Sequence, residues 1–135
     1  MKTFLAFLVV ALSGCAVFQN TNRQAELEGH RERTMVAYRD CMLRAADTYK
    51  DSQTTAFEGA VAAQAECAAQ FHEYREVVEA SFEEATPNAM PSKIRALANE
   101  ACAEVESGAK ALVVQRIVRK RVPAKSPSAS QSHPK

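Results

Sequence analysis

The 135-residue chain has no tryptophan, only nine aromatic residues, four glycines and five prolines. Large side chains are too few for a thick globular core, and turn-forming residues are too few for a series of short strands. Alanine, in contrast, occurs 25 times and favours helix over sheet. These scarcities argue against all-β and alternating β/α architectures and predict an all-α protein.

Motifs that carry catalysis or metal binding are also missing. The sequence has no G-x-S-x-G, no H-E-x-x-H and no glycine-rich phosphate loop. No C-x₂-C pair occurs, and spacings of 26 and 35 residues separate Cys41, Cys67 and Cys102, which match no zinc pattern. His72 and Glu76 could share a metal, but they lie among other glutamates and are more simply part of a solvated face. We therefore expect no enzyme, no cofactor and no metal site.

Three helices are predicted, over about 22–50, 55–85 and 91–121, packed as a small antiparallel arrangement with short loops. Thr55 and Glu58 form a capping box at the start of the second helix, and Pro87 and Pro91 separate the second helix from the third. Gly108 is a weak point of the third helix. The apolar positions expected to face inward recur at steps of three and four: Met35, Tyr38, Met42, Ala45 and Tyr49; Phe57, Val61, Gln64, Ala68, Phe71, Val78 and Phe82; Ile94, Leu97, Ala101, Val105, Ala109, Leu112 and Ile117.

The N-terminus carries a targeting signal. Residues 4–12 are an apolar run that would reach about 14 Å as a helix, roughly half of a bilayer core, so the run is too short to span a membrane. It has the length of a signal-peptide core. Leu12-Ser13-Gly14-Cys15 then resembles the lipobox of bacterial lipoproteins. The alternative is an ordinary secretory peptide cleaved after Ala16.

The resemblance to lipoproteins implies cleavage before Cys15, a diacylglyceryl thioether on its sulfur, and acylation (palmitate) of the new N-terminus. Ala16 stands where an aspartate commonly retains lipoproteins in the inner membrane, so the resemblance implies the outer membrane, facing the periplasm. The expected organisation is a cleaved signal peptide (1–14), a lipidated tether (15–21), a helical domain (22–121) and a disordered, basic, Pro/Ser-rich tail (122–135).

Export would place the remaining cysteines in an oxidising compartment. Cys41 and Cys67 lie at nearly equal distances along the chain from the turn at 51–54, so we expect them to form a disulfide across the first hairpin. Closing this loop would contribute about 3–4 kcal/mol. Cys102 is offset from Cys67 by about two helical turns and is expected to be unpaired. Pairing with Cys67, an intermolecular disulfide, or three buried free thiols remain open alternatives.

Charge is unevenly distributed although the net charge is only +1. Residues 51–106 hold eleven acids and three bases, whereas the chain from Ser107 onward holds seven bases and no acid. The candidate basic patch is Arg116, Arg119, Lys120, Arg121 and Lys125. Its candidate partners are anionic lipid headgroups or an acidic envelope protein, and the alternative is a favourable helix C-terminus followed by a solubilising tail. Nucleic acid is not an expected partner.

Together these features predict a lipid-anchored cell-envelope lipoprotein that acts as a structural or interaction module, with an envelope protein as its expected partner. The alternative is a periplasmic helical protein that binds a small apolar ligand or a metal. In that case a pocket between the helices would be lined by the larger apolar side chains: Met35, Met42, Phe57, Phe71 and Met90.

Overall fold

The computed structural model describes the backbone of residues 3–122 and the side chains of residues 22–122. The Cys15 side chain, and the predicted tail from Pro123 onward, lie outside this description. The described chain is entirely helical apart from its connections: α1 (Thr3–Tyr49), α2 (Ala56–Glu66), α3 (Ala68–Ala85) and α4 (Pro91–Arg121). The prediction of an all-α protein is therefore confirmed.

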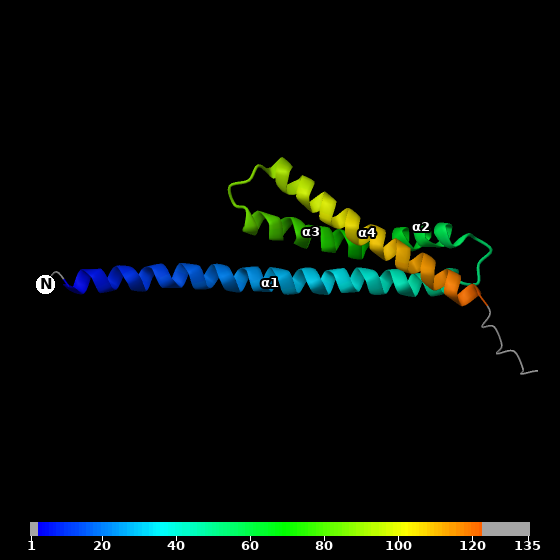
Figure 1. The fold of residues 1–135 in the computed structure, drawn as a ribbon, viewed down its shortest axis with the longest axis horizontal. Coiled ribbons are helices and arrows are strands. Elements are labelled where there is room, and N and C mark those ends of the chain that lie inside the picture. The colour runs from blue at the N-terminus through cyan, green and yellow to red at the C-terminus, as the bar shows by residue number, and fades with distance from the viewer. Residues whose placement is uncertain (1–2, 123–135) are drawn as a thin grey trace, which may run out of the picture.

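The helices form a bundle with α1 as its longest element (Figure 1). After the turn at residues 50–55, α2 and α3 run back along α1 one after the other. After the turn at residues 86–90, α4 crosses α3 and α2 and ends beside the C-terminus of α1 (Figure 1). This is the predicted antiparallel path, with α1 starting at Thr3 rather than near residue 22.

The prediction of three helices is wrong, because the helix expected over 55–85 is divided at Cys67. Cys67 has φ −98° and ψ 16°, which departs from helical geometry, although its N–H still bonds to Ala63 O and its carbonyl accepts from Phe71 N–H. No glycine or proline marks this position. Cys67 is bonded to Cys41 of α1, so the helix changes direction where the chain is held to its neighbour.

The predicted start of α2, the end of α3 and both ends of α4 are confirmed. Thr55 Oγ1 accepts from Glu58 N–H at 3.1 Å, and Glu58 Oε2 accepts from Thr55 N–H at 2.7 Å, which completes the capping box of α2. The hydrogen bond from the Thr55 N–H to the Glu58 carboxylate, and a second one from the Thr55 hydroxyl, lower the pKa of Glu58. Pro91 opens α4, where its missing N–H costs no helical hydrogen bond.

The core consists of two buried clusters. The larger joins α1, α2 and the C-terminal half of α4, and the smaller joins α3 to the N-terminal half of α4. Tyr38 and Phe71 pack ring against ring at 5.1 Å, and Phe71 contacts both clusters. On α1 the predicted inward positions Tyr38, Met42 and Ala45 are buried as expected.

On α2 the predicted inward face is wrong. Phe57 and Val61 are 62% and 46% exposed, and the buried positions are instead small: Gly59, Ala60, Ala63 and the adjoining Cys67. A Cβ at Gly59 would lie 2.9 Å from Ile117 Cδ1 and 3.1 Å from Tyr49 Cβ. The neighbouring helices are therefore too close for large side chains between them, and α2 turns its small residues inward.

Gly59 and Gly108, which lie within α2 and α4, should respond oppositely to substitution by alanine. Gly59→Ala should lower the free energy of unfolding by about 1 kcal/mol or more, because overpacking outweighs the gain in helix propensity. Gly108→Ala should raise it by about 0.5–1 kcal/mol, since no atom lies within 4 Å of the added Cβ. Urea unfolding of both variants measures the difference, and a stabilising Gly59→Ala would show that the contact between α2 and its neighbours is looser than described.

Candidate functional site

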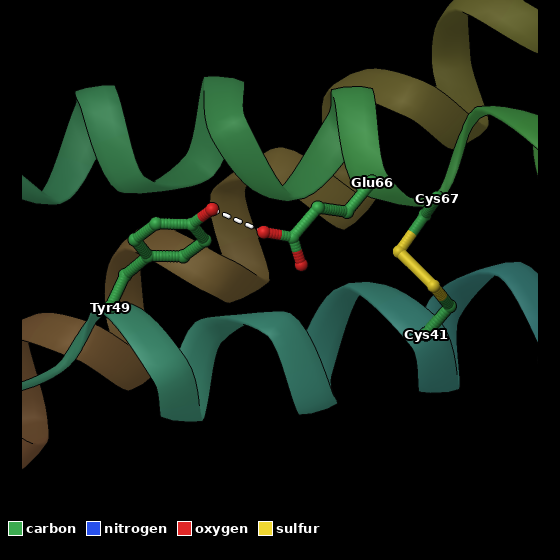
Figure 2. The surroundings of a disulfide bond; sticks show 4 residues. All are labelled: Cys41, Tyr49, Glu66 and Cys67. Atoms are coloured by element: carbon green, nitrogen blue, oxygen red, sulfur yellow. Dashed lines mark hydrogen bonds between the residues drawn. A yellow bond between two sulfur atoms is a disulfide. The ribbon is translucent and has the colours of Figure 1, made fainter.

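The Cys41–Cys67 disulfide links α1 to the junction of α2 and α3 (Figure 2). The sulfur atoms lie 2.04 Å apart and the Cα atoms 5.9 Å apart, so the predicted pairing is confirmed. Cys67 is fully buried and Cys41 is partly buried. Further along the same interface, the Tyr49 hydroxyl hydrogen-bonds to the Glu66 carboxylate, which raises the pKa of Tyr49 (Figure 2).

Cys102 is free and buried among the described side chains. It belongs to the smaller core cluster with Tyr74, Val78 and Ala98. Burial raises the pKa of its thiol, so the thiol is protonated at neutral pH and poorly nucleophilic. This placement agrees with the prediction that Cys102 is unpaired and behaves as a small apolar core residue.

Four of the five residues of the predicted basic patch lie in the last turns of α4, and two of these bind one carboxylate. Arg116 donates to both Asp47 oxygens, at 2.9 and 2.7 Å, and Lys120 donates to the same carboxylate. Hydrogen bonds from Arg116, and to a smaller extent from Lys120, lower the pKa of Asp47. The hydrogen bond to Asp47 raises the pKa of Arg116. The charges of these two bases are thus partly balanced within the fold.

Arg121 holds the turn that follows α1. Its guanidinium donates to four backbone carbonyls, at 2.8 Å to Tyr49, 2.9 Å to Lys50, 3.1 Å to Ser52 and 2.8 Å to Thr54. The final carbonyls of a helix have no partner within the helix. Tyr49 O also accepts from the Ser52 N–H and hydroxyl, and Arg121 adds a charged donor to it and to the carbonyls of the turn that follows. One side chain therefore joins the C-terminus of α4 to the C-terminus of α1.

Arg119 has no ion-pair or hydrogen-bond partner among the described residues and is exposed, and Lys125 lies outside the described part of the chain. A hollow of about 310 Å³ lies beside Arg119, between α1 and α4. Leu43 and Leu112 give it an apolar lining, and Gln115, Arg116, Arg119 and Lys120 give it a polar, basic one. Residues 47–54 and 116–122 make up this tip of the bundle, which we call the basic end; it carries five basic and two acidic side chains.

Other chemistry at the surface is simple. His72 Nε2 and Glu76 Oε1 lie 3.2 Å apart and are both exposed. Among the described residues no three His, Cys, Asp or Glu side chains gather in a way that could hold a metal ion. Likewise, no helix in the described range contains a segment both long and apolar enough to cross a bilayer.

The residues expected to line a ligand pocket are not brought together. Met42 is fully buried in the larger cluster, whereas Phe57 on α2 and Met90 before α4 are 62% and 70% exposed. Met35 lines a different hollow, of about 260 Å³, with Tyr74 and charged residues of α1 and α4. These side chains surround no common cavity.

Comparison with known proteins does not assign the chain to a family. Neither protein-family models, nor curated proteins, nor solved structures give a match to this chain. The arguments for function therefore rest on the residues themselves.

Removing the Arg121 guanidinium should destabilise the bundle. Arg121→Met should lower the free energy of unfolding by about 1–3 kcal/mol, because charge-assisted hydrogen bonds to several carbonyls are lost together. Arg121→Lys should retain only part of the stability lost in Arg121→Met, because an ammonium group cannot reproduce the planar set of donors of a guanidinium. The matched control, Arg119→Met, should change stability by less than about 0.5 kcal/mol. Equal effects of Arg121→Met and Arg119→Met in urea unfolding would contradict the assigned role of Arg121.

The Asp47 ion pairs should give the bundle an acid-sensitive component of stability. The pKa of Asp47 is lowered in the folded state, so its contribution is present above about pH 4 and is lost as pH falls below that value. Asp47→Asn should therefore be less stable than the parent at pH 7, and the difference should shrink in more acidic buffer. Asp51→Asn, at an exposed neighbouring position, is the control. Chemical unfolding at each pH measures the difference in stability between Asp47→Asn and the parent. A difference that stays constant across this range would contradict the role of Asp47.

Proposed function

We propose that this protein is a lipoprotein of the bacterial cell envelope, anchored through acylated Cys15 and acting as a structural or interaction module rather than an enzyme. The proposal of an anchor is based on the order of residues 2–15: a lysine, a short apolar run, and the lipobox-like Leu12-Ser13-Gly14-Cys15. Acyl chains attached at one point give stable membrane attachment without a spanning helix.

The Cys41–Cys67 pair supports export. Disulfides persist in oxidising compartments such as the periplasm and are rare in the cytosol. In this chain the bonded pair lies within the larger core, at the junction of α2 and α3, so the bond is part of the bundle's construction. A fold built in this way suits a protein that matures outside the cytosol.

The surface supports an interaction module. The hollows described lie between neighbouring helices and mix apolar with charged side chains. His72 and Glu76, the pair considered for a metal, lie next to each other on an exposed face of one helix. We propose an envelope partner contacted through the surface of the bundle, with Ala16 favouring an outer-membrane address that faces the periplasm.

The anchor is tested by replacing its sulfur. Cys15→Ala should abolish metabolic labelling with palmitate and leave the uncleaved precursor, because a methyl group cannot accept the diacylglyceryl chain. Cys102→Ala, which removes a thiol from the core, should retain full labelling and normal cleavage. Labelling that persists in Cys15→Ala would refute the proposed lipoprotein.

A further inference from the structure

The two halves of the bundle carry opposite charge. The disulfide divides them: residues 22–40 and 68–105 hold eleven acidic and seven basic side chains, a net charge of −4. Residues 41–67 and 106–122 hold five acidic and seven basic side chains, a net charge of +2. The sequence beyond Val122 adds two lysines and no acid. The bundle is therefore electrically polar along its length.

The basic half also exposes most of the large apolar side chains found at the surface. Of the six such residues with high exposure in the described chain, four lie there: Phe57 and Val61 on α2, and Val118 and Val122 at the end of α4. Phe57 and Val61 are four residues apart and share one face of α2. Val118 lies one turn before Val122, the residue that caps the C-terminus of α4. Arg119 stands beside Val118 on the exposed side of α4.

This combination has the chemistry of a membrane surface. Cationic side chains attract anionic headgroups, and neighbouring apolar side chains enter the boundary between headgroups and acyl chains. The hollow lined by Leu43 and Leu112 together with Arg116, Arg119 and Lys120 brings apolar and cationic side chains together in the same way. A polysaccharide would use the charge but gain little from the exposed valines.

The basic end lies far from the lipid anchor. Asn22 and Tyr49 are separated by 27 residues of continuous helix, which span about 40 Å, and Cys15 precedes Asn22 by seven residues. The α3–α4 turn and the acidic half lie at the end nearer the anchor (Figure 1). Because α1 is continuous between Asn22 and Tyr49, the basic end can extend away from the membrane that holds the anchor.

We propose that the basic end, with exposed Phe57, Val61, Val118 and Val122, binds the anionic surface of a second bilayer, so that the protein bridges two membranes. This inference rests on the proposed acylation of Cys15, which supplies the first attachment.

Reconstitution of the purified, full-length mature protein tests the bridge. The protein is inserted through its acyl chains into phosphatidylcholine vesicles, which are mixed with vesicles of equal parts phosphatidylcholine and phosphatidylglycerol. Energy transfer between dyes on the two vesicle populations measures bridging. We expect bridging to anionic vesicles, little to vesicles of phosphatidylcholine alone, and a marked decrease with added salt.

Matched surface variants locate the contact. Arg119→Glu with Val122→Ser should weaken bridging about tenfold, because a charge is reversed and an apolar side chain is removed. Arg95→Glu with Met90→Ser makes the same changes at exposed positions near the opposite end and should leave bridging unchanged. Unchanged thermal unfolding of both variants shows that the fold is intact.

The outcomes separate the two proposals. A preparation whose intact mass lacks the acyl groups refutes the anchor. A preparation that carries them but fails to bridge, that bridges equally with both variants, or that binds isolated peptidoglycan in place of anionic vesicles overturns the second membrane contact alone.

Discussion

The covalent bond between Cys41 and Cys67 is the constraint around which the bundle is arranged. It attaches the middle of α1 to the residue at which α2 ends and α3 begins. One core cluster surrounds the bond and extends toward the C-terminus of α4, and the other lies beyond it, between α3 and the first half of α4. Each half of the bundle has one of these clusters, and the disulfide holds both halves to α1.

Close approach of helices follows from the small side chains around this bond. Gly59, Ala60 and Ala63 let α2 approach α1 and α4, but small residues bury little apolar area each. Burial raises the pKa of Tyr38 to about 12, with a further contribution from the charge of Glu106. At the basic end Arg121 and the Asp47 ion pairs add polar contacts between α1 and α4 to the apolar packing of Ile117.

Local patterns in the sequence were sufficient for much of this fold. Helix content, the Thr55 capping box, the turns and the Cys41–Cys67 pairing follow from propensity and from distances along the chain. The break at Cys67 and the outward position of Phe57 could not be predicted, because both depend on how closely α2 approaches residues far away in sequence. The partners of Asp47 and Arg121 lie about seventy residues away, so no local signal marked them. Four of the five predicted patch residues lie at the end of α4, but sequence could not separate Arg116, Lys120 and Arg121, which bind within the fold, from exposed Arg119.

Export, acylation and the disulfide form one connected account, which a count of free thiols tests directly. The mature protein is denatured without reductant, alkylated and weighed intact. The account predicts one alkylated thiol, that of Cys102, in a chain that carries acyl groups. Three alkylated thiols would contradict the Cys41–Cys67 bond, and two or four would show that Cys15 is unmodified.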